Sequence, residues 1–285
     1  MIPAAFDYES PRNLSEALSL LARDDAKLLA GGHSLLPAMK LRLSSPALLV
    51  DLGRVSGLAY IRDAGDHISI GAMATHETIA SSVLLHSDSP LLAQAAAHIG
   101  DVQVRNRGTI GGSLAHADPA ADYPAAILAL DAELVAASSA GERLIPARDF
   151  FTALFSTALK PNEILTEIRA PKTNHAGTAY KKFHHPASGF AVVGVAAIVS
   201  MNGAKIDKAS IGITGVAEKA YRATAVERAL QGHPLSAIPE AARHATGAGL
   251  QPLSDPYASG DYRRHLASVF TRRALEEAAR RRRGK

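Results

Sequence analysis

Two Gly-Gly pairs constrain this chain more than any other feature of its sequence. Gly31-Gly32 directly follows the apolar segment 26–30, and Gly111-Gly112 stands between an isoleucine and a serine. Paired glycines adopt positive φ and let a backbone approach a ligand closely, and successive amide N–H groups can bind a phosphate. Neither pair matches the G-x-G-x-x-G fingerprint or the P-loop. The pairs alone therefore predict either tight turns or a phosphate or dinucleotide site.

The chain of 285 residues contains no cysteine. This excludes disulfides, thiolate zinc sites, a cysteine nucleophile and a cysteine-ligated iron–sulfur cluster on this chain. No apolar run reaches the roughly 18–20 residues that span a bilayer, and the first residues do not resemble a signal peptide. We therefore expect a cytoplasmic protein without a membrane span.

The basic excess is concentrated in the last residues. The net charge is +4, and residues 280–285 read Arg-Arg-Arg-Arg-Gly-Lys. Cations suit the C-terminal end of a helix, and no aromatic residues are interleaved with this segment as single-strand binding would require. A solvated helix end is the better interpretation, and no nucleic-acid partner is expected.

The pattern of elements predicts an α+β protein. Asn13 followed by Glu16 is typical of a capping box that starts a helix over residues 13–23, and strands are expected at 26–30 and 48–51. Helices are expected from Thr75 to about 85, over 90–98 and over 150–155. The stretch 190–201 is apolar on both faces, so it should be a central strand, and Asn202-Gly203 predicts a hairpin after it. Three helices close the chain.

The residues around both glycine pairs resemble the flavin-binding motifs of a known family. Residues 30–37, Ala-Gly-Gly-His-Ser-Leu-Leu-Pro, are similar to the first motif of the FAD-binding (medium) subunits of the xanthine dehydrogenase and carbon monoxide dehydrogenase family, the molybdenum hydroxylases. Residues 107–122, Arg-Gly-Thr-Ile-Gly-Gly-Ser-Leu-Ala-His-Ala-Asp-Pro-Ala-Ala-Asp, are similar to the second. The second motif is long and specific, and the resemblance covers nearly the whole chain.

The resemblance implies a two-domain fold. A two-lobed FAD-binding domain of the PCMH type would occupy residues 1–175, with lobes at about 1–55 and 56–175. A C-terminal domain of antiparallel sheet and helices, like that of the CO dehydrogenase flavoprotein, would occupy 178–282.

The resemblance also implies which residues contact FAD. The two motif segments would wrap the pyrophosphate and ribityl chain, and a lysine of the pair Lys181-Lys182 would lie near the isoalloxazine. We favour Lys182, and Lys181 remains the alternative. The implied cofactor-binding residues are Leu29, Ala30, Gly31, Gly32, His33, Ser34, Leu35, Thr109, Ile110, Gly111, Gly112, Ser113, Asp122, Leu165 and Lys182. Neither catalytic side chains nor metal ligands are expected on this chain.

One residue of that set and two features outside it have two interpretations each. His33 could attach the flavin covalently, as in a larger related group of flavoproteins, but a backbone contact with the ring turned aside is favoured. Phe190 either lies against the flavin face or opens the core strand that follows it. His184-His185 suggests a metal pair, although adjacent strand residues point to opposite faces.

The implied function is that of the FAD subunit of a heterotrimeric molybdenum hydroxylase. Electrons would come from two [2Fe–2S] clusters on a small partner subunit, after oxidation of a substrate at a molybdopterin cofactor on a large one, and would leave through FAD to an external acceptor. The assembly would be a dimer of heterotrimers. A free-standing flavin-dependent oxidoreductase on the same fold is the alternative, and a non-enzymatic nucleotide-binding protein is a third possibility. The substrate and the acceptor stay open.

Overall fold

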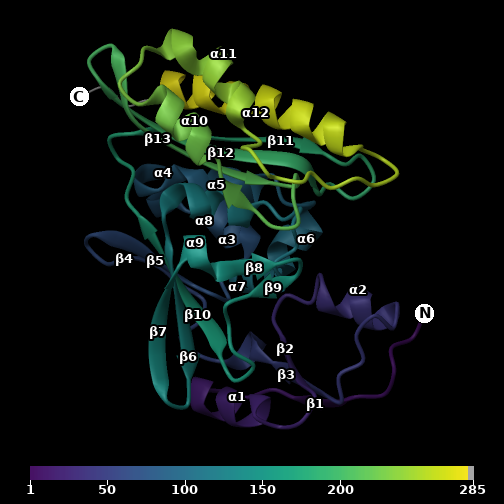
Figure 1. The fold of residues 1–285 in the computed structure, drawn as a ribbon. Coiled ribbons are helices and arrows are strands. Elements are labelled where there is room, and N and C mark those ends of the chain that lie inside the picture. The colour runs from purple at the N-terminus through teal and green to yellow at the C-terminus, as the bar shows by residue number, and fades with distance from the viewer. Residues whose placement is uncertain (282–285) are drawn as a thin grey trace.

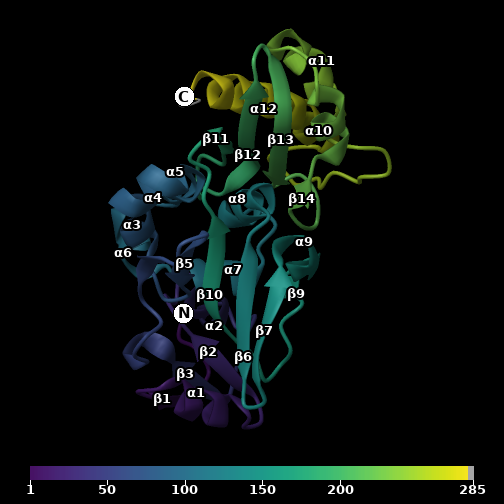
Figure 2. The ribbon, with the colours of Figure 1, turned by 90° about the vertical axis from the view of Figure 1, so that its left-hand side faces the viewer.

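The computed structural model describes residues 1–281, so most of the basic segment 280–285 lies outside the described residues. A lower part built from two small sheets carries an upper part in which one sheet is covered by helices (Figures 1 and 2). This α+β architecture, with the antiparallel sheet and helices last, confirms the expected fold class.

The first lobe is a small parallel sheet of order β1-β3-β2. Its elements are β1 (Asp7–Glu9), α1 (Leu14–Leu21), β2 (Ala26–Leu29), α2 (Leu35–Lys40), β3 (Leu48–Asp51) and a 3-10 turn (Leu52–Arg54). Asn13 caps α1 by accepting the Glu16 N–H, and Glu16 in turn accepts the Arg12 N–H. The predicted helix start is therefore confirmed, with the reciprocal bond displaced by one residue.

The second lobe is a five-stranded antiparallel sheet of order β4-β5-β10-β6-β7, with helices packed at one end (Figure 2). The strands are β4 (Ile61–Asp63), β5 (His67–Gly71), β6 (Glu133–Ser138), β7 (Gly141–Pro146) and β10 (Ile164–Pro171). The helices are α3 (His76–Ala80), α4 (Val83–Asp88), α5 (Pro90–Ala97), α6 (Val102–Arg107), α7 (Ile110–His116), α8 (Tyr123–Leu130) and α9 (Ala147–Phe150).

The C-terminal part is an antiparallel sheet of order β11-β12-β13-β14, covered on its outer face by the last helices. The strands are β11 (Gly177–His184), β12 (Ala191–Asn202), β13 (Lys205–Thr214) and β14 (Tyr221–Arg222). The helices are α10 (Thr224–Leu230), α11 (Ile238–Ala241) and α12 (Gly260–Arg280), with 3-10 turns at Leu235–Ala237 and Ala242–His244. The buried strand β12 lies between β11 and β13, as predicted, and a hairpin follows it at residues 202–205.

Two helix predictions were wrong in part. The segment expected to be a helix over 150–155 is a hairpin of β8 (Phe151–Ala153) and β9 (Ser156–Thr157), because Phe155 takes a left-handed φ of 51° that a helix does not allow. The helix expected from Thr75 to about 85 is broken into α3 and α4, because Ser82 leaves the helical conformation and caps α4 through the Leu85 N–H. The strands β1, β4 and β7 were not predicted.

The two parts are joined by close packing of α8 under β12 and β13 (Figure 2). The loop before α8 is bonded to the C-terminal sheet: Thr214 Oγ1 donates to the carbonyls of Pro119 (2.7 Å) and Ala121 (2.8 Å), and the Ala191 N–H donates to Ala120. This loop ends the second motif, so its position depends on both parts. No helix among residues 1–281 is long and apolar enough to cross a membrane.

The contact between α8 and β13 gives a test of this packing. A Cβ on Gly212 would lie 2.0 Å from the Ala125 carbonyl oxygen, so Gly212→Ala must push α8 away from the sheet. We expect a loss of about 2–3 kcal/mol in the free energy of unfolding. Gly247→Ala is the matched control, because within residues 1–281 no atom beyond its two chain neighbours lies within 4 Å of its added Cβ. Urea unfolding of both variants measures the difference, and equal stabilities would contradict this packing.

Candidate cofactor site

The two glycine segments, distant in sequence, contact each other directly. A Cβ on Gly31 would lie 2.3 Å from the Arg107 carbonyl oxygen and 2.7 Å from the Gly108 Cα. A Cβ on Gly112 would lie 3.5 Å from the Ala30 Cβ. The structure therefore brings the two predicted motifs into one site, and glycine is required at position 31 by the backbone that crosses it.

The second glycine pair serves the protein's own packing. Thr109 is the N-cap of α7 and accepts the Gly112 N–H on its hydroxyl, so a Cβ on Gly112 would lie 2.8 Å from that oxygen. The N–H groups of Ile110, Gly111 and Ser113 also have protein acceptors, and Gly111 packs against the Ala72 backbone. This pair therefore fixes the start of α7 and offers few free amides.

The first glycine segment differs from the second in the hydrogen bonding of its backbone N–H groups. Within residues 1–281, the consecutive N–H groups of Gly32, His33, Ser34 and Leu35 donate to no protein acceptor, and the Ser34 hydroxyl caps nothing. Gly32 turns the chain at φ 79°, a conformation that glycine adopts at low cost. A run of unpaired amides around such a turn is a typical anion-binding arrangement.

A buried ion pair joins the loop before α8 to strand β11. Lys182 Nζ donates to Asp122 Oδ2 (2.9 Å) and to the His98 carbonyl (2.9 Å), and the Tyr180 hydroxyl donates to Asp122 Oδ1 (2.6 Å). The Lys182 and Asp122 side chains are 3% and 5% exposed. Burial raises the pKa of Asp122, and the charge of Lys182 and the Tyr180 hydrogen bond oppose that rise. Lys182, rather than Lys181, thus lies with Asp122.

The strand period explains this arrangement. Tyr180 and Lys182 are two residues apart on β11, so both point to the same face, and Lys181 points to the other. Gly194 lies on the neighbouring strand β12, where a Cβ would stand 2.3 Å from the Tyr180 hydroxyl. Glycine at that position leaves room for the tyrosine to reach Asp122.

Leu165 and His33 of the predicted set, together with His116 of the second motif and Phe190, differ in how deeply they are buried. Leu165 is buried on β10 beside a β-bulge, a feature often found next to functional sites. The His33 side chain is exposed, and the half-buried His116 ring packs against Phe155 at 5.2 Å between centroids. Phe190 is 44% exposed. The interpretation of Phe190 as a core residue is therefore wrong, and its ring is available at the surface.

A cleft of about 370 Å³ opens beside the buried ion pair, within the size range of small-molecule pockets. It is lined from both sides of the junction by His98, Gly100, Asp101, Val104, Lys182, His184, Ser188 and Gly189. Lys182 is its one residue from the predicted set, and no sequence signal had indicated the loop of residues 98–101.

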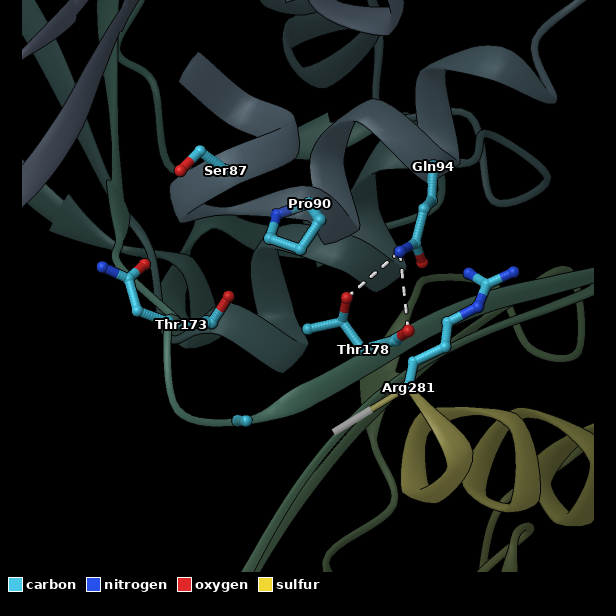
Figure 3. Close-up of a pocket in the computed structure, with 8 residues that line it drawn as sticks. Ser87, Pro90, Gln94, Thr173, Thr178 and Arg281 are labelled. Carbon is cyan, nitrogen blue, oxygen red and sulfur yellow. Dashed lines mark hydrogen bonds between the residues drawn. The ribbon is translucent and has the colours of Figure 1, made fainter. Parts of the chain in front are cut away.

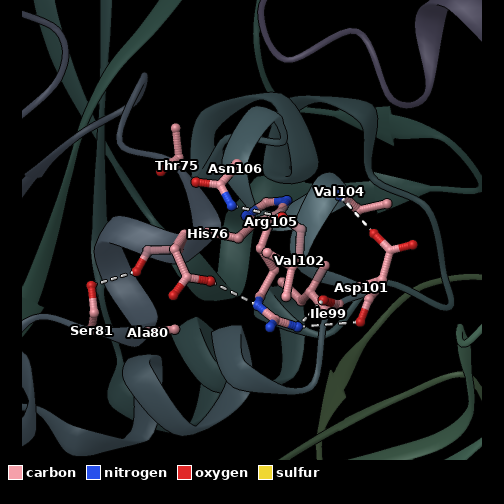
Figure 4. A network of polar contacts seen from close by, with 12 residues as sticks. Thr75, His76, Ala80, Ser81, Ile99, Asp101, Val102, Val104, Arg105 and Asn106 are labelled. Carbon is pink, nitrogen blue, oxygen red and sulfur yellow. Dashed lines mark hydrogen bonds and ion pairs between the residues drawn. The ribbon is translucent and has the colours of Figure 1, made fainter.

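A polar network holds that loop in place (Figure 4). Arg105 on α6 donates to Glu77 on α3 (3.0 Å) and to the carbonyls of Ile99 and Gly100 (both 3.3 Å). Asp101 caps α6 by accepting the Val104 N–H at 2.8 Å. These contacts fix the chain next to His98, whose carbonyl accepts from Lys182.

A second hollow of about 190 Å³ lies where the segment between β10 and β11 meets α5 and the end of α12 (Figure 3). Gln94 crosses it by donating to the hydroxyl and the carbonyl of Thr178. None of the residues that line it belongs to the predicted cofactor set, so we assign it to the joint between the two parts.

A buried histidine lies behind the glycine segments, and sequence reasoning missed it. His76, 5% exposed, contacts the Tyr123 hydroxyl through Nδ1 at 3.2 Å. Burial lowers the pKa of His76 from 6.5 to about 4. The folded protein therefore holds this imidazole neutral over a range in which the unfolded chain binds a proton.

This difference predicts a pH dependence of stability. As the pH falls from 7 to 4 the unfolded chain gains the His76 proton first, so the free energy of unfolding should fall, by about 3 kcal/mol from this residue. His76→Phe should lose that part of the dependence, whereas His175→Phe, at an exposed ring, should keep it. Urea unfolding at several pH values measures the slopes, and identical slopes for His76→Phe and the unchanged protein would refute the assignment.

Comparison with known proteins shows the family of the chain. Residues 4–173 match the FAD binding domain in molybdopterin dehydrogenase, and residues 178–278 match the CO dehydrogenase flavoprotein C-terminal domain. The chain is 40% identical to the 6-hydroxypseudooxynicotine dehydrogenase complex subunit alpha of Paenarthrobacter nicotinovorans, over 98% of this chain and 96% of that one. It is 39% identical to the carbon monoxide dehydrogenase medium chain of Hydrogenophaga pseudoflava, over 98% of both.

Solved structures give the same result. The structure of carbon monoxide dehydrogenase from Hydrogenophaga pseudoflava that lacks the Mo-pyranopterin moiety superposes with a TM-score of 0.96 at 41% identity, covering 99% of this chain and 100% of that one. Quinoline 2-oxidoreductase from Pseudomonas putida 86 superposes with a TM-score of 0.93 at 37% identity, covering 98% and 99%. The chain thus belongs to the family of FAD-binding subunits of the molybdopterin dehydrogenases.

Proposed function

We propose that this chain is the FAD subunit of a molybdenum hydroxylase, which receives electrons from the [2Fe–2S] clusters of a partner and passes them through FAD to an external acceptor. The observation that carries the proposal is the run of amides from Gly32 to Leu35, which have no protein acceptor within residues 1–281. This run directly follows Gly31, where the first segment crosses the second motif. The similarity to medium chains over the full length supports it.

The residues present fit a dinucleotide of this kind. Four amides and the Ser34 hydroxyl can donate to a pyrophosphate without breaking any hydrogen bond among residues 1–281, so binding would not cost these protein contacts. The second motif would form one wall of the site by holding α7 against the first segment. The residues that do so are Thr109, Ile110, Gly111, Gly112 and Ser113. We assign Leu29, Ala30 and Leu165 to the walls of the same site.

Asp122 and Lys182 would act on the flavin end of the site. Flavin, when bound, supplies the electron transfer, and the protein supplies position and electrostatics. Lys182 contributes a cation whose ammonium group is already fixed by two acceptors. Such a fixed charge needs little reorganisation when negative charge develops nearby. We propose that this pair sets the electrostatic surroundings of the flavin.

The partners follow from the same proposal. This chain has no cysteine, so [2Fe–2S] clusters would be held by a small subunit and the molybdopterin cofactor by a large one. We propose a dimer of heterotrimers in the cytoplasm, with an FAD-binding domain at 1–175 and a C-terminal domain at 178–282. Nicotine derivatives, carbon monoxide and other substrates named among the relatives all remain candidates.

The experiment is purification of the complex from its native source, with a visible spectrum and metal analysis. We expect two further subunits, molybdenum and about four irons per flavin, as two [2Fe–2S] clusters require. A yellow single chain without metals, which reduces its own flavin on addition of a small substrate, would instead support the free-standing flavoenzyme.

A single hydroxyl tests the placement of the pyrophosphate. Ser34→Ala removes a donor that the protein does not use, so stability should be unchanged while the FAD dissociation constant rises about tenfold, the typical loss for one charge-assisted hydrogen bond. Ser139→Ala, in the exposed turn between β6 and β7, is the matched control. Fluorescence titration with FAD measures both. Equal affinities for the two variants would rule out Ser34 as a cofactor contact.

A further inference from the structure

We propose that His76 is a positioning residue for the cofactor site: its ring sets the distance between the crossing glycine segments and the helix that begins after Asp122. The inference rests on the proposed function, because its consequence is the affinity for FAD. It concerns a residue that belongs to neither glycine motif.

The first contact is with the second glycine segment. The His76 N–H donates to the Gly108 carbonyl at 2.9 Å, and a Cβ on Gly108 would lie 2.4 Å from His76 Nε2. The ring therefore packs directly on the Cα of Gly108. The same Cα lies 2.7 Å from the Cβ position of Gly31. The first segment, the second segment and the His76 ring are thus stacked without a gap.

The second contact is with α8. His76 Nδ1 lies 3.2 Å from the Tyr123 hydroxyl, with the ring centroids 5.3 Å apart, and Tyr123 is fully buried. Tyr123 directly follows Asp122, which is bonded to Tyr180 and Lys182. A continuous series of contacts therefore connects Gly31 to the buried ion pair, and His76 is at its centre.

The protonation state supports this role. Burial raises the pKa of Tyr123 well above 10 and lowers that of His76 to about 4. At neutral pH both groups are therefore uncharged, so the contact is a hydrogen bond between a neutral ring and a neutral hydroxyl. A hydrogen bond to one defined partner holds a ring in one orientation, which a purely apolar side chain of the same size would not do.

Substitutions can remove the hydrogen bond between His76 and Tyr123 while keeping the packing of the His76 ring on Gly108. Tyr123→Phe deletes one oxygen and keeps the packing, and His76→Phe keeps a ring against Gly108 but cannot accept a hydrogen bond. Tyr221→Phe is the matched control, because Tyr221 is a half-buried tyrosine of the C-terminal part whose hydroxyl donates to the Ala245 carbonyl. All variants are made in the full chain, purified with its partners, stripped of flavin and titrated with FAD.

We expect Tyr123→Phe and His76→Phe each to raise the FAD dissociation constant about tenfold, and the double variant to do no more than either alone, because the bond is lost only once. The absorption spectrum of the bound flavin should shift in both. Tyr221→Phe should keep the affinity and the spectrum even where it lowers the melting temperature.

The outcomes are distinct. Unchanged affinity and spectrum in both His76 and Tyr123 variants, with lowered melting temperatures, would overturn the positioning role and leave the proposed function standing. Additive losses in the double variant would also overturn it, since independent effects do not require the shared bond. An unaltered protein that takes up no FAD would overturn the proposed function itself, and this inference with it.

Discussion

The buried pair of Asp122 and Lys182 is the interaction on which the proposed site depends, because it joins the two parts of the chain beside the cleft that opens at their junction. A buried pair of this kind adds little net stability, since desolvation offsets most of the attraction, but removal of one partner is strongly destabilising. Its effect is therefore to select one placement of the two parts of the chain relative to each other. The Tyr180 hydroxyl donates a further hydrogen bond to Asp122, and the His98 carbonyl accepts one from Lys182. Neither charged group can therefore move independently.

Glycine has two separate roles around that pair. Gly31, Gly108 and Gly111 are required because backbone or ring atoms occupy the place of a side chain. Gly32 is required by its positive φ, and it alone lies in the segment whose amides remain unpaired. The longer and more specific motif, which contains Thr109 to Ser113, is thus mainly a packing element, and among residues 1–281 the consecutive amides without a protein acceptor lie in the first segment.

The sequence predicted the fold class and the meeting of the two motifs, because glycine pairs and a long motif carry local and specific information. The two-residue period of β11 also indicates which lysine shares a face with Tyr180: it is Lys182, which contacts Asp122, whereas the proximity of either lysine to the flavin stays a prediction. His76 and the loop of residues 98–101 could not be predicted, because their roles arise from contacts between segments far apart in the chain. The hairpin at 151–157 was missed because one left-handed residue, Phe155, overrides local helix propensity.

The two ends of the proposed site differ in their hydrogen bonding. The groups at the proposed flavin end are bonded to one another already: Asp122 accepts from Lys182 and Tyr180, and Arg105 fixes the adjoining loop through two carbonyls. The proposed pyrophosphate end has, among residues 1–281, four amides without a protein acceptor instead. Binding would therefore gain most of its energy from the first segment, while the electrostatic surroundings of the redox-active ring would be set before the cofactor arrives.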